Sequence, residues 1–126
     1  MVIVQKKSLR KPSGARYHVA PTKRTHQKGS APARTTIGER RVLVRRTKGG
    51  NQKNRTLRAK EVNVFDPAKK TFFKATIKSV EENTANHHFE RRNIITKGAI
   101  VETEKGRVKI TNRPGQEGTI NGIKLT

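Results

Sequence analysis

Short runs in the second half of the chain alternate hydrophobic and polar residues, as β-strands with one buried face do. In the run 40–46, Val42 and Val44 share one face, and arginines flank Leu43 on the other. The run 73–77 repeats the pattern, with lysine and threonine between its apolar residues. Both runs predict strands that place one face in a hydrophobic core.

The run 57–65 changes phase, because Ala59 belongs to one alternation and Val62 to the opposite one. Such a change predicts a bulge or a tight corner near Lys60–Glu61. Asp66-Pro67 then predicts a turn, since the proline ring presets the backbone for the second turn position. Strand, corner, strand and turn are therefore expected before the run at 73–77.

Residues 83–93 show no period and are expected to form a polar loop. Three short strands are predicted after this loop, over Ile100–Thr103, Arg107–Thr111 and Thr119–Leu125. Lys105-Gly106 suits a two-residue turn between the first two of them. Gly122 is expected to form a bulge in the last.

About six short strands joined by turns predict a mainly β fold over residues 41–126, either a small antiparallel β-barrel or a sandwich. A domain of this size buries only about 60% of its unfolded surface, so marginal stability without a partner is expected. The expected core residues are Val42, Val44, Leu57, Val62, Val64, Phe73, Ile77, Ile100, Val108, Ile110, Ile120, Ile123 and Leu125.

Residues 1–40 follow neither period and are expected to form an extended basic arm. Pro12, Pro21 and Pro32 would break any helix longer than about three turns. A disordered solubilising tail is one interpretation, because blocks of like charge are often disordered when free. We favour an arm that threads between phosphates and folds on contact, since Tyr17 and two histidines that can contact bases interrupt its cations.

The net charge of +21 lies mostly in the first half of the 126-residue chain. Residues 1–60 contain 18 Lys and Arg and a single acid, Glu39, whereas residues 61–126 contain 12 Lys and Arg and eight acids. A compact chain with this charge repels itself, and a polyanion such as a phosphate backbone offsets the repulsion. The first half is therefore expected to make the electrostatic contact.

The composition excludes several cellular compartments and several kinds of chemistry for this protein. Only 30% of the residues are hydrophobic, and the absence of cysteine excludes disulfides, thiolate chemistry and cysteine-based zinc sites. No apolar run approaches the roughly 18 residues of a membrane-spanning helix. The N-terminus lacks a signal-peptide core, and no amphipathic stretch suits a membrane surface. A cytoplasmic protein without a membrane partner is expected.

The segment Arg45–Arg58 carries the most informative local pattern. Gly49 and Gly50 let the backbone approach phosphates closely, and Asn51, lysines and arginines surround them. No Gly-Lys-Ser/Thr follows at the spacing of a P-loop. An ordinary hairpin with solvated charges is one interpretation. A hairpin tip inserted into an RNA groove explains the combination better, since asparagine can also read a base edge or a 2′-hydroxyl.

The sequence contains no pattern typical of catalysis or metal binding. His87 and His88 would point to opposite sides of an extended chain, and no third ligand lies at a suitable spacing. Acid pairs such as Glu81-Glu82 lie among lysines and arginines, as solvated charges do. A protein that is not an enzyme is expected, with no cofactor, no metal and no small-molecule substrate.

Several stretches also carry a resemblance to a known family. They are Lys11–Gly14, Gly49–Ala59, Asn63–Pro67, Arg91–Ile100 and Arg113–Gly118, and together they span nearly the whole chain in order. On these residues the chain resembles the archaeal and eukaryotic family of small-subunit ribosomal protein eight, and its short form resembles the archaeal branch.

That resemblance implies a small β-barrel with a basic N-terminal extension, bound to the rRNA of the small ribosomal subunit. It further implies neighbouring small-subunit ribosomal proteins as partners, a place in the cytoplasmic ribosome and a scaffolding role without catalysis. A DNA-compacting, chromatin-like basic protein is the alternative from another class. A third, an RNA-modifying enzyme, would need a cofactor fingerprint or an acid–base cluster that the sequence does not show.

The expected RNA-binding residues combine the arm, the glycine hairpin and the segment after residue 90. They are Lys6, Lys7, Arg10, Lys11, Arg16, Tyr17, His18, Lys23, Arg24, His26, Lys28, Arg34, Arg40, Arg41, Arg45, Arg46, Lys48, Gly49, Gly50, Asn51, Lys53, Arg55, Arg58, Arg91, Arg92 and Lys97.

Overall fold

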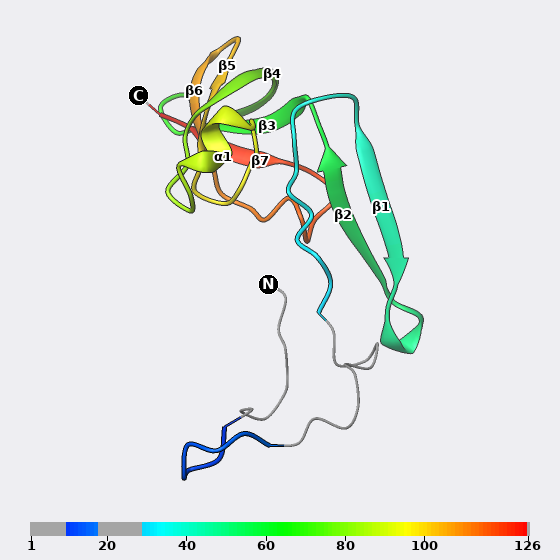
Figure 1. Ribbon diagram of the computed structural model, residues 1–126. Coiled ribbons are helices and arrows are strands. Elements are labelled where there is room, and N and C mark those ends of the chain that lie inside the picture. Colours follow the sequence, from blue (N-terminus) through cyan, green and yellow to red (C-terminus); the bar gives the residue numbers. More distant parts are fainter. Residues whose placement is uncertain (1–9, 18–28, 126) are drawn as a thin grey trace. The chain divides into compact units, whose positions relative to one another are not determined.

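A computed structural model of the chain describes residues 10–17 and 29–125 (Figure 1). The described residues belong to two units, one within Met1–Pro32 and one within Ala33–Thr126, and each is described by itself. Within these ranges, no helix has both the length and the apolar character needed to cross a membrane.

Five strands of the C-terminal unit form a closed barrel, which confirms the predicted fold (Figure 1). They are β3 (Glu61–Asp66), β4 (Thr71–Glu82), β5 (Ile100–Thr103), β6 (Gly106–Ile110) and β7 (Asn121–Lys124). Consecutive strands pair antiparallel, and β7 closes the barrel by pairing parallel with β3. This closure distinguishes a barrel from a sandwich of two sheets.

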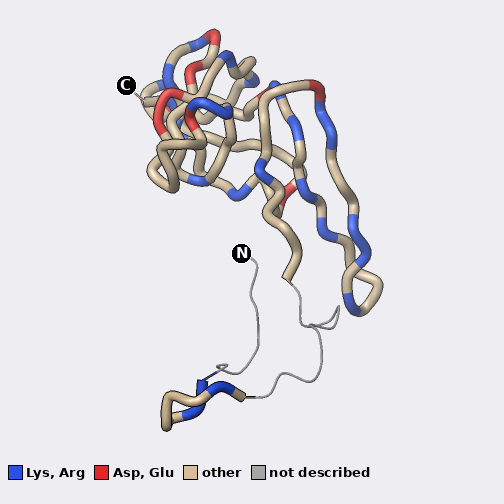
Figure 2. The backbone as a smooth tube through the Cα atoms, in the orientation of Figure 1, with Lys and Arg blue, Asp and Glu red and all other residues tan. Residues whose placement is uncertain are grey.

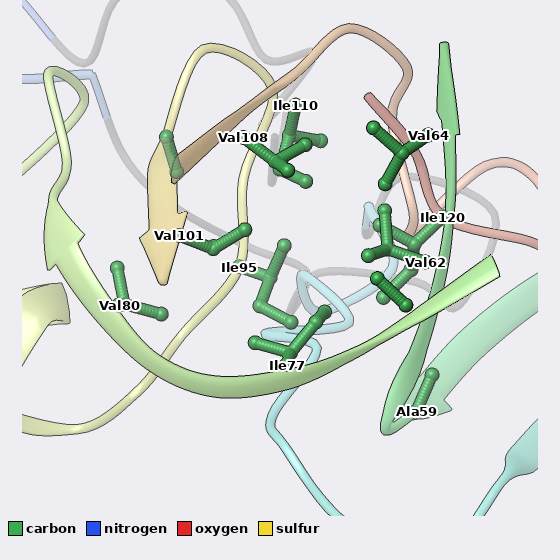
Figure 3. Close-up of a cluster of buried hydrophobic side chains, with 12 residues drawn as sticks. Ala59, Val62, Val64, Ile77, Val80, Ile95, Val101, Val108, Ile110 and Ile120 are labelled. Carbon is green, nitrogen blue, oxygen red and sulfur yellow. The ribbon is translucent and has the colours of Figure 1, made fainter. Parts of the chain in front are cut away.

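Branched aliphatic side chains from alternate strand positions fill the barrel (Figure 3). Val62 and Val64 of β3 and Ile77 of β4 are at most 2% exposed, as the two-residue period predicts. The buried cluster also contains six residues outside the predicted core, namely Ala59, Ala75, Val80, Ile95, Ala99 and Val101.

Strands β1 (Arg41–Arg46) and β2 (Gln52–Arg58) form a separate two-stranded sheet that projects from the barrel (Figure 1). Their apolar residues were predicted in the core, and this prediction is wrong. Val44 is 55% exposed, and Val42 and Leu57 are only partly buried. The alternation is present, but the hairpin extends beyond the barrel, so its apolar face does not reach the interior.

The chain passes from the hairpin into the barrel at Ala59–Lys60, where a corner was predicted. The amide of Ile77 in β4 donates to the carbonyl oxygen of Lys60 (2.8 Å) and fixes the corner against the barrel. The change of phase therefore marks the passage from one sheet to another. Asp66-Pro67 begins the turn between β3 and β4, also as predicted.

The polar loop at 83–93 contains a short helix, α1 (His88–Arg91), which was not predicted. Buried Asn83 holds this region together, because its side-chain amide donates to the carbonyl oxygen of Ile94 (3.0 Å) and its Oδ1 accepts from the Thr96 hydroxyl (2.8 Å). The turn between β5 and β6 is Glu104-Lys105, one residue earlier than predicted, with Gly106 already paired in β6.

Gly122 forms no bulge in β7, and its backbone pairs regularly with both β3 and β6. A Cβ at this position would collide with Cγ1 of Val108 and lie 2.9 Å from the carbonyl oxygen of Lys109. Because no bulge resets the alternation, Gly122 faces the interior and Ile123 faces outward. Ile123 was predicted in the core, and this prediction is wrong, because the residue is 40% exposed.

Candidate nucleic-acid interface

One face of the β1–β2 hairpin is cationic. The register pairs Arg45 with Lys53 and Leu43 with Arg55, and the side chains of these alternate pairs lie on the same side of the ribbon. Figure 2 shows Lys and Arg along both strands down to the connecting loop. Residues 40–58 contain eight Lys and Arg and no acid, so the hairpin projects positive charge that no acid of its own offsets.

Two buried threonines anchor the hairpin to the rest of its unit. The amide of Thr56 donates to the carbonyl oxygen of Pro114 (3.0 Å). The hydroxyl of Thr56 donates to the carbonyl oxygen of Glu117 (2.8 Å). Thr35, which is 2% exposed, donates its hydroxyl to the carbonyl oxygen of Thr56 (2.6 Å). These hydrogen bonds give the hairpin a fixed base, and therefore a fixed direction relative to the barrel.

Two glycines shape the loop between β1 and β2. The loop contains a 3-10 turn, η2 (Lys48–Gly50), in which Gly49 and Gly50 have φ values of 72° and 77° that glycine adopts without steric cost. The amide and hydroxyl of Thr47 donate to the carbonyl oxygen of Asn51 (2.7 and 3.0 Å). A Cβ at Gly50 would meet nothing within 4 Å, so this tip is open to a ligand.

In the N-terminal unit, residues 10–17 form a tight basic turn. The amide of Lys11 donates to the carbonyl oxygen of Ala15 (2.8 Å), and Gly14 takes a φ of 82° in the three-residue loop between them. The guanidinium of Arg10 donates to the carbonyl oxygen of Gly14 (2.9 Å), and Lys11 Nζ lies 5.5 Å from the ring centroid of Tyr17. All eight residues are exposed, including the predicted contacts Arg10, Lys11, Arg16 and Tyr17.

The other predicted contacts occupy different parts of the chain. Arg91 ends α1, which packs on β4, and Arg92 and Lys97 lie exposed beyond it. Arg34 and Arg40 are exposed in the segment that leads into the hairpin. The remaining predicted residues, Lys6, Lys7, His18, Lys23, Arg24, His26 and Lys28, lie outside the described residues.

The anchoring threonines were missed by sequence reasoning. Thr56 lies between Arg55 and Leu57 and has the pattern of an ordinary strand residue. Its partner Glu117 is 61 positions away, and Thr35 is 21 positions away on the other side. No local pattern carries such information, because it depends on which distant segments the fold brings together.

The described acids and histidines form no group that could hold a metal ion. The rings of His87 and His88 contact each other with their centroids 3.9 Å apart, and both residues are exposed. Two ion pairs lie on the barrel strands, Arg107 with Glu81 (2.5 Å) and Lys124 with Asp66 (3.5 Å). Acids thus offset part of the positive charge of the barrel, whereas the hairpin strands contain none.

The carboxylate of Asp66 has a shifted pKa. Burial by itself would raise this pKa, but hydrogen bonds from the amides of Lys69 and Ala68 and the charge of Lys124 outweigh burial. The pKa of Asp66 therefore lies below its ordinary value of 3.8, and the carboxylate stays ionised in the turn between β3 and β4.

The fold and the distribution of charge define a small, strongly basic β-barrel protein with a projecting cationic hairpin. This chain belongs to the ribosomal protein S8e family, whose model matches residues 4–125. The family that the sequence motifs resembled is thereby confirmed.

Archaeal relatives match the chain over almost their whole length, and each carries the name small ribosomal subunit protein eS8. The protein of Methanosphaera stadtmanae is 50% identical in an alignment that covers 99% of this chain and 99% of the relative. That of Methanobrevibacter smithii is 49% identical over 99% of this chain and all of its own length. That of Methanoculleus marisnigri is 47% identical over 96% of this chain and 97% of its own.

Proposed function

We propose that this protein is a structural constituent of the small ribosomal subunit, in the cytoplasm, that binds and stabilises folded rRNA. The names of its relatives support this role. The observation that carries the proposal is the β1–β2 hairpin, which projects seven Lys and Arg from the barrel without an acid among them. A scaffold of this kind needs no cofactor, metal or catalytic residue.

In the proposed mechanism the arm and the hairpin contact RNA, and the barrel positions them. Cations from Lys6 to Arg46 neutralise phosphates where RNA helices approach each other, since phosphate contacts supply most of the affinity of such proteins. The segments Gly49–Arg58 and Arg91–Lys97 add secondary contacts. The barrel holds these contacts in register through the threonine anchors at the base of the hairpin. Neighbouring small-subunit ribosomal proteins are further partners.

Binding to folded rRNA and to duplex DNA at the same salt concentration tests this proposal. If about ten cations engage phosphates, log K should fall against log salt with a slope of about −7 to −9. Folded small-subunit rRNA should bind more tightly than duplex DNA of equal phosphate content. Equal or tighter binding to duplex DNA would contradict the proposal and favour a DNA-compacting protein.

A further inference from the structure

A second surface lies on the outer wall of the barrel, on strands β3, β4, β6 and β7. The register of β4, β3, β7 and β6 places outward side chains in two rows. One row consists of Phe72, Phe65, Ile123 and Lys109. The adjacent row consists of Lys74, Asn63, Asn121 and, beyond β6, Thr111, whose amide donates to the carbonyl oxygen of Asn121 (3.0 Å). We call these two rows the aromatic platform.

The aromatic ring of Phe72 is the most exposed large apolar group of the platform. Phe72 is 80% exposed, and its ring lies 4.8 Å from that of Phe65, measured between centroids. Phe65 is itself partly buried, so it supports Phe72 from one side. Phe72 thus presents a supported π-face to its surroundings, in a position where packing within the chain does not require an aromatic residue.

Two amide side chains lie beside the aromatic pair. The Nδ2 of Asn63 donates to the Oδ1 of Asn121 (3.1 Å), which fixes both groups across β3 and β7. Within the described part of the chain, this bond leaves Asn63 Oδ1 as a free acceptor and Asn121 Nδ2 as a free donor. An acceptor on one side chain and a donor on the other complement the edge of a nucleobase, which presents both kinds of group.

The platform is flanked by positive charge and is slightly hollow. Lys74 ends one row on β4, and Lys109 ends the other on β6, both exposed. A hollow of about 440 Å³ lies between the rows, lined by Phe65, Phe72, Ile123, the two asparagines, Gly122 and Thr111. Two acids lie beside the platform and not within its rows, because Glu61 is in the next row along β3, opposite Thr76, and Glu39 lines a neighbouring hollow with Asn63 and Lys74.

We propose that the aromatic platform binds an unpaired RNA base, which stacks on Phe72 while Asn63 and Asn121 bond its edge. Aromatic rings combined with flanking lysines are the usual means by which β-barrels hold single-stranded nucleic acid. A neighbouring protein's apolar side chain could use Phe72 and Ile123, but it would leave the amide pair and both lysines without a complementary partner. The inference rests on the proposed function, because it adds a base contact to a protein that already binds RNA phosphates.

The test compares two single-stranded RNA oligonucleotides of equal length, one with bases and one abasic, in binding to the full-length protein at fixed salt. The wild-type protein should bind the base-containing RNA more tightly. Phe72→Ala should weaken that binding by roughly five- to 150-fold, the range for loss of one stacked base, and leave abasic binding unchanged. Phe72→Trp should retain the preference, because it keeps a π-face.

Phe72→Leu separates stacking from apolar docking, since leucine keeps the apolar surface and removes the ring. Phe89→Leu, on α1, is the matched control for an aromatic-to-aliphatic change and should keep wild-type binding. Equal wild-type binding of the two oligonucleotides, or wild-type affinity in Phe72→Leu, would overturn the platform as a base site. The second result would assign the surface to an apolar protein neighbour.

A charge variant of the hairpin distinguishes this inference from the proposed function. Replacing Arg45 and Lys53 by glutamine should weaken binding of the two oligonucleotides by the same factor, because it removes phosphate contacts alone. If that variant weakens binding while Phe72→Ala does not, the platform is refuted and the proposed function stands. If the wild-type protein binds neither oligonucleotide nor folded rRNA, both are refuted.

Discussion

At the scale of single residues, Gly122 shows how closely β6 and β7 approach each other. A Cβ there would meet the Val108 side chain and the backbone oxygen of Lys109, and the backbone oxygen cannot move without breaking the strand pairing. We expect Gly122→Ala to lower the free energy of unfolding by about 1–3 kcal/mol, the cost of overpacking a core. Urea denaturation monitored by circular dichroism measures this.

Gly14→Ala is the control for this substitution. Gly14 belongs to the N-terminal unit, and a Cβ there meets nothing within 4 Å. It should leave the unfolding of the barrel unchanged. Unaltered stability in Gly122→Ala would contradict the close approach of the two strands.

The lowered pKa of Asp66 makes the stability of the folded chain depend on pH. Because its pKa is lower in the folded chain than its ordinary 3.8, the ionised form stabilises the fold above pH 3.8, and this contribution is lost as the pH falls through the folded value. We expect Asp66→Asn to lower the melting temperature at neutral pH and to approach the wild type below pH 3.8. Melting curves across this range test the sign.

Glu82→Gln, at an exposed acid on β4, provides the matched loss of one negative charge. It should change the melting temperature little at any pH. A constant difference between wild type and Asp66→Asn at all pH values would show that shape, and not ionisation, makes Asp66 stabilising.

At the scale of elements, the β1–β2 hairpin presents a cationic face within residues 29–125. Arg45 and Lys53 are cross-strand neighbours on its cationic face. We expect the double glutamine variant to weaken binding to folded rRNA and to make the log K against log salt slope less negative by about 1.4–1.8, since each lost phosphate contact contributes about 0.7–0.9. Filter binding at several salt concentrations measures the slope.

Lys78→Gln on β4 is the control for the hairpin variant, because Lys78 is an exposed lysine of the barrel outside every proposed contact. Its slope should match that of the wild type. An unchanged slope in the Arg45 and Lys53 double variant would remove the hairpin from the interface.

The elements themselves were largely predictable from the sequence, and the reasons differ from strand to strand. Val62, Val64 and Ile77 alternate with polar residues and lie in the core, because a barrel strand has one buried face and one solvent-exposed face. Val42 and Val44 alternate in the same way but lie on a projecting hairpin. Periodicity shows that one face of a strand is apolar, but it does not show whether other elements cover that face. The barrel strands and the hairpin strands therefore look alike in the sequence.

At the scale of the whole molecule, the division into two units leads us to expect that RNA binding by the arm is separable from folding of the barrel. Thr35 is buried against the hairpin, whereas residues 10–17 of the N-terminal unit are exposed. We expect deletion of residues 1–32 to leave the circular dichroism spectrum and melting temperature of the barrel nearly unchanged. Affinity for folded rRNA should fall sharply and its salt dependence should flatten, because eight Lys and Arg are removed.

A longer deletion that also removes Thr35 is the informative comparison. It takes away the hydrogen bond to Thr56 at the base of the hairpin, so it should lower stability as well as affinity. If the shorter deletion bound rRNA as tightly as the full chain, the placement of the main contact in the arm would be wrong.

Charge predicts which half of the chain contacts RNA, whereas the direction of the hairpin is not visible in the sequence. The excess of Lys and Arg in residues 1–60 is a property of composition and is visible in the sequence. The direction of the hairpin depends on Thr56 and Glu117, which are 61 residues apart. The aromatic platform likewise depends on the parallel pairing of β3 with β7, the first and last barrel strands along the chain. No local pattern in the sequence reveals this pairing.

Sedimentation with ribosomal particles tests the central claim most directly. The tagged full-length protein is run through a high-salt gradient with the particles and crosslinked to RNA. We predict stoichiometric retention on small subunits, with crosslinks from residues 5–58 to rRNA. Loss of the protein to the light fractions at moderate salt, or crosslinks mainly to DNA, would contradict a structural role in the small subunit and indicate a general binder of polyanions.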